Sequence, residues 1–487
     1  MKKRSGFIKK MSVGMKASIV YTISSLLSRG LAIITVPIFT RLMSTEQIGV
    51  VNLFTSWQSM IGAVATLSLT SGGFMVAMRE YEHKRNQYMS SVLTLTSLVA
   101  LVLSIVYIMN PAFWNALLEM PTPLVVLMLV GYFVTPATDF WLARQRYEYK
   151  YIKAGILTMV SAIASSIFAV VAVVYASKRG MGDLATVRLY SGYLVTYGVA
   201  IIIWLTTMLK GKTFINKEFW TFSLGLSIPL IGNSIAMQVL SVSDRAMISK
   251  MISNSAVGIY SILYTVSSLS LIVWSAINSS YVPFLYENIE KKEMKQSIRN
   301  SSTALMLSYG IIAIVLTLIA PEIVRVLATK EYYEAIYIMP PIAAGIFLTS
   351  ISNMYSNILV YLKKTKYIMI SSGLAAILNV VLNYIFINKY GYFAAAYTTL
   401  FAYIILALSQ AIIASYESRR IFKNEYSVYD NRKLAGISVV TILLCIACLP
   451  LYSMDLLRYF IIILMLMLTF LFRKKILNLI GYKRNVG

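Results

Sequence analysis

Long apolar stretches separated by short polar segments run along the whole chain of 487 residues. A bilayer core about 30 Å thick is crossed by a helix of about 20 apolar residues. Within lipid, only helices and closed barrels satisfy every backbone hydrogen bond. The pattern therefore predicts an all-α, polytopic membrane protein with about fourteen transmembrane helices. The expected spans are residues 15–40, 48–72, 88–109, 122–143, 152–175, 187–209, 219–243, 256–281, 301–320, 338–361, 367–388, 392–415, 434–451 and 455–472.

The first span carries one charge near its middle, Arg29. At about 1.5 Å per residue, Arg29 lies roughly 16–21 Å from either end of the span, too far for its guanidinium to reach a headgroup. A charge at this depth is costly against lipid, so we expect it to face a partner or a water-filled cavity. Helical spacing places a polar stripe on one face of this span. The stripe consists of Ser18, Thr22, Ser25 and Arg29.

The distribution of positive charge predicts the orientation of the spans. The chain is 58% hydrophobic and 13% charged, yet its formal net charge is +25. The basic residues lie in short loops, so they indicate membrane orientation and not nucleic-acid binding. One alternate set of segments holds 33 of the 44 Lys and Arg residues, which places both termini in the cytoplasm. This set comprises the N-terminal segment, 73–87, 144–153, 210–218, 286–299, 363–366, 416–433 and the C-terminal tail.

A weak internal repeat relates the two halves of the chain. The segment RLMSTEQIGVVNLFTS at 41–56 aligns with KMISNSAVGIYSILYT at 250–265, an offset of 209 residues that pairs Gly49 with Gly258. Each half contains six expected spans, an even number, so we expect a parallel repeat about an axis along the membrane normal. The expected lobes are residues 1–210 and 211–416, followed by a linker and two further spans in residues 417–487.

The same offset places Arg29 opposite Gln238, and Ser25 opposite Ser234, in span 7. Span 7 has its own polar stripe at helical spacing. Its members are Ser227, Ser234, Gln238, Ser241 and Arg245. Two related helices with polar faces at the same depth would line a central cavity shared by the lobes. The alternative is that these side chains form hydrogen bonds between helices, as serine and glutamine commonly do within membranes.

Two acidic residues in the spans are candidate sites for a coupling ion, either H⁺ or Na⁺. Asp139 in span 4 could pair with Arg29, relay a proton or reach the membrane interface. Asp244 lies beside Arg245 toward the outer end of span 7. We expect Asp244 and Arg245 to act either as a gate or as ordinary interface charges.

The other polar motifs indicate packing and not chemistry. Asparagine pairs in spans 10 and 11 could bind sugar hydroxyls, but holding helices together is the favoured interpretation. These pairs are Asn353 with Asn357 and Asn379 with Asn383. Cys445 and Cys448 form a CxxC in an apolar run without a His or basic neighbour, which favours two small buried residues over a metal or redox site. Because the sequence has no Walker loop, HExxH, GxSxG or enclosed carboxylate pair, we expect no enzymatic activity, cofactor or metal.

The first hairpin, RGLAIITVPIFTRLMSTEQIGVVNLFTSW, resembles the signature of polysaccharide flippases of the Wzx type, in the multidrug/oligosaccharidyl-lipid/polysaccharide (MOP) exporter superfamily. That signature has a midspan Arg, a second Arg at the outer end of span 1, and a polar S-x-E/D-x-x-G turn into span 2. The residues at these positions are Arg29, Arg41, Ser44, Glu46 and Gly49. The lipid II flippase branch has a similar S-R…R spacing, matched by Ser28, Arg29 and Arg41.

This resemblance implies two six-helix lobes around a cationic cavity, and transfer of undecaprenyl-diphosphate-linked oligosaccharides to the outer leaflet. A guanidinium can bind a diphosphate through bidentate, charge-assisted hydrogen bonds, so Arg29 is the expected anchor. The expected substrate-binding residues are Arg29, Ser25, Thr22, Gln238, Ser234, Arg245 and Arg41. Because Gln238 stands opposite Arg29 in the second lobe, the number of cavity cations stays open. The last two spans resemble those that form a groove for the lipid tail in related flippases.

We therefore predict a non-enzymatic flippase for O-antigen or capsule repeat units, working by alternating access in the bacterial cytoplasmic membrane. Its expected partners are membrane lipid, polyprenyl-diphosphate-linked oligosaccharide, a coupling ion, and polysaccharide polymerase and chain-length proteins. The alternatives are a lipid II flippase, a cation-coupled multidrug exporter and a membrane glycan polymerase. An Arg in span 1 disfavours the exporter, whose cargo is usually cationic. The short loops disfavour the polymerase, which would need a large outer catalytic loop.

Overall fold

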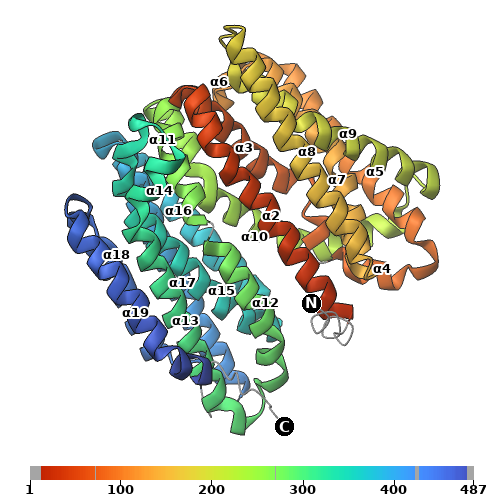
Figure 1. The fold of residues 1–487 in the computed structure, drawn as a ribbon. Helices are drawn as coiled ribbons and strands as arrows, with labels where there is room; N and C mark the ends of the chain where they lie inside the picture. Colours follow the sequence, from red (N-terminus) through yellow and green to blue (C-terminus); the bar gives the residue numbers. More distant parts are fainter. Residues whose placement is uncertain (1–12, 72, 269, 423–426, 480–487) are drawn as a thin grey trace, which may run out of the picture. The chain divides into compact units, whose positions relative to one another are not determined.

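The computed structural model describes residues 13–71, 73–268, 270–422 and 427–479. Within these ranges the chain consists of helices joined by short turns, and no β-strand occurs there. The predicted all-α class is therefore confirmed. Contacts divide the chain into two compact units, residues 1–258 and 259–487, and each unit is a bundle of long helices (Figure 1).

The first unit is built around long helices that pack side by side. α2 packs on α8, α8 on α9, α9 on α7, and α10 on α3. α11 begins in this unit and continues into the second. The helices are α2 (Val13–Leu42), α3 (Thr45–Ala65), η1 (Leu69–Ser71), α4 (Gly73–Glu80), η2 (Glu82–Lys84), α5 (Arg85–Met109), α6 (Pro111–Leu118), α7 (Thr122–Tyr147), α8 (Tyr151–Lys178), α9 (Leu184–Gly211), α10 (Lys217–Met251) and α11 (Asn254–Ser268).

The second unit is centred on α15, which is mostly buried. α15 packs on α13 and α17, and α16 packs on α17. The C-terminal helices α18 and α19 both pack on α13. The helices are α12 (Ser270–Asn288), η3 (Lys292–Met294), α13 (Lys295–Leu318), α14 (Ala320–Leu327), η4 (Lys330–Ile338), α15 (Met339–Tyr361), α16 (Thr365–Tyr390), α17 (Tyr392–Ile421), α18 (Asn431–Ala447), η5 (Leu449–Ser453) and α19 (Asp455–Leu479).

Eleven helical segments of the described chain are long and apolar enough to cross a membrane, and the bent helix α10 makes twelve. α2 and α19, with 30 and 25 residues, coincide with the expected first and last spans. Some of their side chains lie outside the described residues. The multi-pass membrane class is therefore confirmed, whereas the count of fourteen is not.

α10 corresponds to span 7 and is bent by 49° between its two halves, Lys217–Ile228 and Ile231–Met251. In the sequence, Pro229 stands between these two halves, and a proline within a helix removes one backbone hydrogen bond. The first half is anchored in the first unit, where the Tyr88 hydroxyl hydrogen-bonds Ser223 at 2.8 Å. Contacts thus group span 7 with the first unit. The lobe boundary at residue 210 stays a prediction from the repeat.

Short polar side chains mark the starts of several helices. At α3, the Gln47 backbone N–H donates to Ser44 Oγ, and the Ser44 backbone N–H donates to Gln47 Oε1, both at 3.2 Å. Asp183, Asn216 and Asp430 accept similar bonds at the starts of α9, α10 and α18. These side chains satisfy backbone N–H groups that have no partner within the helix. Ser44 of the hairpin signature therefore has a structural role as the first residue of a capping box.

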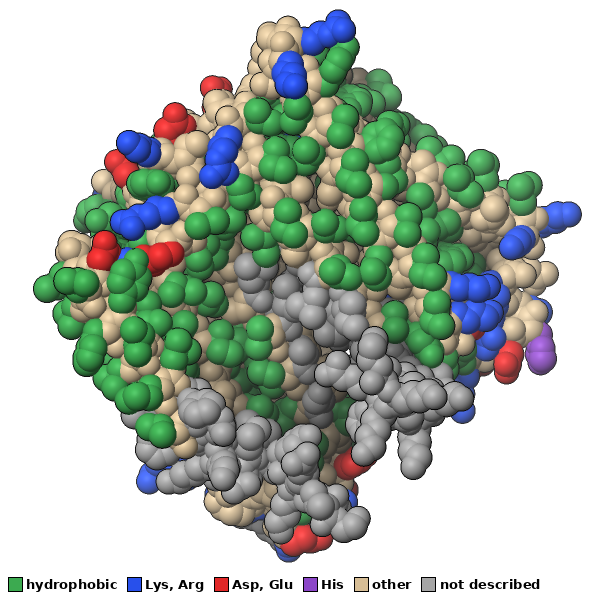
Figure 2. All heavy atoms as spheres, in the orientation of Figure 1, with side chains coloured by type: hydrophobic (Ala, Val, Ile, Leu, Met, Phe, Trp, Pro, Cys, Tyr) green, Lys and Arg blue, Asp and Glu red, His purple; other side chains and the backbone are tan. Residues whose placement is uncertain are grey.

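Hydrophobic side chains cover the outside of many helices. Ile152, Ile156 and Val160 of α8 are exposed, for example, and so are Ile202 and Leu209 of α9. Figure 2 shows hydrophobic side chains over most of the visible face, with Lys and Arg side chains mainly near its edges. Such an extended apolar surface fits a lipid environment, because soluble monomers rarely expose contiguous patches of this size.

Single cysteines at exposed loop positions should report the predicted orientation. In a background without the two native cysteines, we expect Lys84→Cys and Glu293→Cys to react with a membrane-impermeant maleimide only in permeabilised cells. Ala112→Cys, in the loop between spans 3 and 4, should react in intact cells. The physical reason is the retention of Lys- and Arg-rich loops in the cytoplasm. Labelling of Lys84→Cys in intact cells would contradict the predicted orientation and support the opposite one.

Candidate functional site

The predicted substrate contacts of the first span lie on α2, which is helical from Val13 to Leu42. The side chains of three of them, Thr22, Ser25 and Arg29, lie outside the described residues. Arg41, near the end of α2, is exposed, and its Nη1 donates to Pro37 O at 2.8 Å. The role of each of these residues in binding stays a prediction.

α2 approaches α8 closely through other positions. The Ser24 hydroxyl donates to Val20 O at 2.8 Å, and Ser24 is buried. A Cβ on Gly155 of α8 would lie 2.6 Å from Val20 Cγ1 and 3.1 Å from Ser24 Oγ. Glycine at 155 therefore permits the close packing that fixes α2 within the first unit.

α10 carries four residues of the predicted site along one helix. Ser234 and Gln238 are half-buried, whereas Asp244 and Arg245 are only 1% and 7% exposed. Arg245 Nη1 donates to Asp244 Oδ1 at 3.1 Å and to Ser241 O at 2.8 Å. A buried ion pair is kept only where hydrogen bonds offset its desolvation. The burial of Asp244 and Arg245 favours a role as a gate over a role as solvated charges at the membrane interface. The role as a gate stays a prediction.

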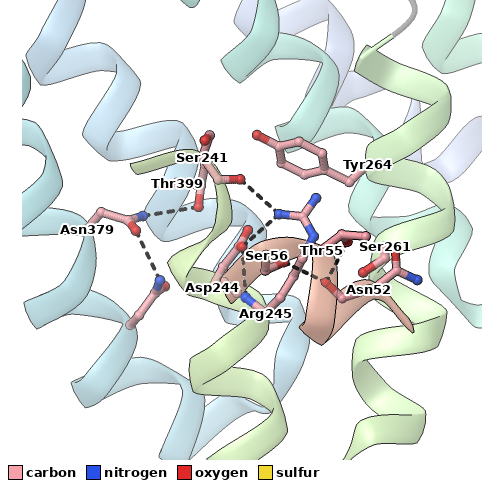
Figure 3. A network of polar contacts seen from close by, with 12 residues as sticks. Asn52, Thr55, Ser56, Ser241, Asp244, Arg245, Ser261, Tyr264, Asn379 and Thr399 are labelled. Carbon is pink, nitrogen blue, oxygen red and sulfur yellow. Dashed lines mark hydrogen bonds and ion pairs between the residues drawn. The ribbon is translucent and has the colours of Figure 1, made fainter. Parts of the chain in front are cut away.

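α3 contributes a polar segment beside this ion pair. The Ser56 and Thr55 hydroxyls donate to Asn52 O at 2.7 and 3.0 Å. Figure 3 shows these three α3 residues beside Asp244 and Arg245 of α10. The sequence prediction included the α10 residues but missed Asn52, Thr55 and Ser56, although their spacing places them on one face of span 2.

A hydroxyl-lined cavity of about 360 Å³, open to the surface, lies among α2, α7, α8 and α9 of the first unit. The Ser165 and Thr196 hydroxyls lie 3.1 Å apart, and Thr138 Oγ1 is buried with no hydrogen-bond partner in the described chain. The sequence prediction missed this cavity, although spacings of three and four residues on α8 indicate a polar face. Its hydroxyl-bearing lining residues are Ser28, Thr138, Thr158, Ser161, Ser165, Ser166 and Thr196.

The two coupling-ion candidates differ in their surroundings. Asp139 is exposed on α7, next to Thr138 of the hydroxyl-lined cavity, and makes no ion pair with the cations that the structure describes. Asp244 is buried against Arg245. The three alternatives for Asp139 therefore stay open, and a role in ion coupling stays a prediction for both residues.

The two copies of the repeat motif meet in the first unit, where the N-terminal turns of α3 and α11 touch. A Cβ on Gly49 would lie 1.7 Å from Asn254 O, and a Cβ on Gly258 would lie 2.2 Å from Thr45 O. The Thr45 and Ser255 hydroxyl oxygens are 2.5 Å apart. Only glycine permits backbones to approach so closely. The alignment identified the two glycines as equivalent, and the structure adds that they face each other.

In the second unit, the asparagines of α16 form hydrogen bonds within the helix bundle. Asn379 and Asn383 are fully buried. Asn379 Nδ2 donates to Thr399 Oγ1 of α17 at 3.1 Å, and Asn383 Nδ2 donates to Asn379 Oδ1 at 3.2 Å (Figure 3). Asn357 of α15 donates to Asn278 at 2.8 Å. These contacts agree with the interpretation that the amides hold helices together.

No group of three or more His, Cys, Asp or Glu side chains that could hold a metal ion occurs among the described residues. Cys445 and Cys448 are buried free thiols. The polar groups described above can therefore supply hydrogen bonds and charge to a bound molecule, and they form no recognisable catalytic constellation.

Two sequence families match the chain. The family "Polysaccharide biosynthesis protein" matches residues 15–289, which is more than half of the chain, and the MatE family matches residues 229–385. Among curated protein sequences, none matches this chain.

Solved structures of two kinds of transporter share the fold. "Lipid II flippase MurJ, inward closed conformation" has a TM-score of 0.65 at 18% identity and covers 94% of this chain and 100% of its own. A multidrug resistance MATE family transporter of the MOP superfamily, in its inward-facing conformation, has a TM-score of 0.59 at 15% identity, with 85% and 99% covered. An outward-facing conformation has a TM-score of 0.57 at 13% identity, with 86% and 98% covered. At these identities the likeness shows the fold alone.

Proposed function

The chain belongs to the polysaccharide biosynthesis protein family of the MOP superfamily, and from this premise we propose that it flips a polyprenyl-diphosphate-linked oligosaccharide repeat unit. The chain is a multi-pass membrane transporter of that superfamily. The observation that carries the proposal is the family match over residues 15–289, which includes the hairpin with Arg29, Arg41 and Gly49. The proposed location is the bacterial cytoplasmic membrane, with surface polysaccharide as the end product.

Arg29 is the proposed anchor for the diphosphate. Placing a charge at mid-bilayer costs at least about 2.5–3.5 kcal/mol on insertion scales. Water or an anionic ligand can offset this cost, and a diphosphate matches the planar fork of a guanidinium. The half-buried Ser234 and Gln238 of α10 are the proposed hydrogen-bond donors to the same headgroup.

Alternating access requires contacts that open and close at the outer end of the carrier. We assign this role to the contact of α3 and α11, where Gly49 faces Asn254 and Gly258 faces Thr45. The nearby Asp244 and Arg245 pair would act with it as a gate, and H⁺ or Na⁺ would drive the cycle through Asp139 or Asp244. The supporting observation is that both copies of the repeat motif supply the contact.

Arg29→Ala should insert and fold normally but lose flipping, because the diphosphate loses its anchor. A charge-assisted hydrogen bond contributes about 1.5–3 kcal/mol, so we expect a loss of about 10- to 100-fold in export rate. Arg29→Lys should keep part of the rate, since the charge stays and the bidentate geometry is lost. Arg41→Ala should matter mainly for release. The measurement is surface glycan per cell, with the level of protein in the membrane quantified in parallel.

The matched control for this experiment is Arg79→Ala, which removes an exposed arginine of α4. It should leave export unchanged. Normal export by Arg29→Ala would refute the anchor. Disappearance of Arg29→Ala from the membrane would instead make Arg29 a structural residue, with Asp139 as the first partner to test.

A lipid II flippase is the second candidate, and one observation favours it. The MurJ structure covers 94% of this chain, whereas the two exporter conformations cover 85% and 86%. Complementation separates the two cargoes. A repeat-unit flippase should restore surface glycan and fail to rescue a strain depleted of its lipid II flippase. Rescue of that strain would move the cargo assignment to lipid II.

A further inference from the structure

A basic pocket lies at one end of the first unit, where four helices come together. Its volume is about 310 Å³. Its lining residues come from α5, α7, α8, α9 and the turn between α7 and α8, at the end of the unit that includes the predicted cytoplasmic segments 144–153 and 210–218. The charged residues that line it are Arg144, Glu148, Lys150, Lys153 and Lys210.

One of these cations is held rigidly. Arg144 Nε donates to Glu148 Oε1 at 2.7 Å, and Arg144 Nη1 donates to Asn86 Oδ1 at 2.6 Å. Lys150 Nζ donates to the other carboxylate oxygen of Glu148 at 2.5 Å. Burial raises the pKa of the Glu148 carboxyl, but the bonds from Lys150 and Arg144 outweigh this effect, so its pKa lies below the ordinary value. The carboxylate therefore stays charged and keeps the arginine fork fixed.

The positive charge of the pocket exceeds the negative charge of Glu148, to which Arg144 and Lys150 are bound. Lys153 and Lys210 are exposed and have no carboxylate within 4.0 Å among the described residues. With four cations and one carboxylate, the lining has a net charge of +3. Trp141, Thr206 and Thr207 also line the pocket, together with Asn86, Met89 and Gln145. Such a lining fits a phosphate group, which accepts several charge-assisted hydrogen bonds at once.

The helix faces below the pocket are apolar and exposed. On α8, Lys153 is followed on the same face by Ile156, which is 58% exposed. On α9, Lys210 and Thr206 lie on one face with Ile202, which is 63% exposed. A soluble phosphate compound has no apolar part that could pack on this surface, whereas the acyl chains of a lipid would lie along it.

We propose that the pocket formed by Arg144, Lys150, Lys153 and Lys210 binds the phosphate of an anionic membrane phospholipid, with its acyl chains on the exposed faces of α8 and α9. Basic pockets between transmembrane helices at this membrane side bind anionic headgroups by the same physics. The site concerns a lipid of the bilayer and not the cargo, so it stands independently of the proposed flipping function. A bound lipid would hold the ends of four helices of the first unit together.

The test uses the purified full-length protein in neutral detergent. Bound lipid is counted by native mass spectrometry during titration with phosphatidylglycerol or, in a second arm, with phosphatidylcholine. We expect tighter binding of phosphatidylglycerol to the wild type. The double variant Lys153→Gln with Lys210→Gln should lose about 25-fold in affinity, since each basic residue near an anionic lipid contributes about 1 kcal/mol, or about fivefold. The control double variant is Lys84→Gln with Lys217→Gln, which changes two exposed lysines outside the pocket and should bind as the wild type does.

Three results would overturn the proposal. The first is undiminished phosphatidylglycerol binding by the Lys153→Gln and Lys210→Gln variant. The second is equal binding of both lipids by the wild type. The third is displacement of phosphatidylglycerol by inorganic phosphate at comparable concentration, which would assign the pocket to a soluble phosphate compound. If the glutamine variant does not fold, the variant Lys153→Arg with Lys210→Arg must keep binding, and about 1 M salt must weaken phosphatidylglycerol binding to the wild type. Failure of either requirement would also overturn the proposal.

Discussion

Gly49→Ala should strongly destabilise the contact between α3 and α11. The new Cβ would lie 1.7 Å from the carbonyl oxygen of Asn254 and 2.5 Å from its carbonyl carbon. Both atoms belong to the backbone, so no side-chain rotation can relieve the clash, and the two helix starts must move apart. Overpacking a well-packed site lowers the free energy of unfolding by about 1–3 kcal/mol. Because the clash is with backbone atoms, we expect the loss for Gly49→Ala to lie at or above the upper limit of this range. The measurement is the unfolding midpoint of the detergent-purified protein.

Gly258→Ala should behave similarly, because its Cβ would lie 2.2 Å from Thr45 O. Gly198→Ala is the matched control, since a Cβ at this position in α9 meets no atom within 4 Å. That substitution should raise stability by about 0.5–1 kcal/mol, the usual difference between alanine and glycine inside a helix. Alanine at Gly49 or Gly258 is thus expected to lower the free energy of unfolding, and alanine at Gly198 is expected to raise it. An unfolding midpoint of Gly49→Ala equal to that of the wild type would mean that the helix starts do not touch.

Gly49→Ala also probes the proposed gate through transport. If the α3 and α11 contact closes the outer end, a variant held apart there should expose this end more often. A cysteine at Glu46, which is exposed in the first turn of α3, should then react faster with an impermeant maleimide in the Gly49→Ala background than in the background with Gly49. An unchanged labelling rate, with impaired export, would separate the packing role from the gating role.

Arg458→Met should release the C-terminal helix α19 from its contact with α14. Arg458 is 0% exposed, and its Nη2 donates to Glu322 Oε1 at 2.5 Å and to Asp455 Oδ1 at 2.7 Å. The Tyr459 hydroxyl donates to the same Glu322 oxygen at 2.7 Å. Removing one partner of a buried ion pair typically costs about 3–5 kcal/mol. Both carboxylates retain some exposure, which places the expected cost near the lower limit.

Two further variants identify the cause of this loss. Arg325→Met removes an exposed arginine of α14 and should change stability little. Arg458→Met combined with Glu322→Gln should recover part of the loss, because no unpaired carboxylate then remains at that position. Hydrogen exchange of α18 and α19 is the local measurement. Protection of these helices in Arg458→Met equal to that in the wild type would show that the ion pair does not hold them.

The fold class could be read from the sequence because hydropathy is a local property. Each described span follows an apolar stretch, and Ser44, Asp183, Asn216 and Asp430 cap helices where the loops end. The bend of α10 was not predicted, even though Pro229 stands in its middle. A proline restricts the backbone locally, but whether the helix ends or only bends depends on the neighbouring helices.

The candidate site was predictable only in part. Helical spacing correctly grouped Ser241 and Arg245 on one face of α10, because periodicity within a helix is fixed by its geometry. It could not reveal Asn52 and Ser56 as their neighbours, nor the ion pair with Asp244 as buried. A sequence shows which side chains share a face, but which helix that face meets depends on packing.

The sequence by itself determined the membrane class and the apolar stretches that form the helices, and it predicted the equivalence of Gly49 and Gly258 and, from the placement of charge, the orientation. Each of these follows from residues close together in the chain or from comparison of two segments. Only the tertiary structure decided that the two glycines touch, that Arg458 contacts two carboxylates, and that basic residues of α7, α8, α9 and the turn between α7 and α8 share one pocket. These features depend on distances between residues that lie far apart in the chain. Such distances are set by close packing of helices and cannot be deduced from spacing along any single helix.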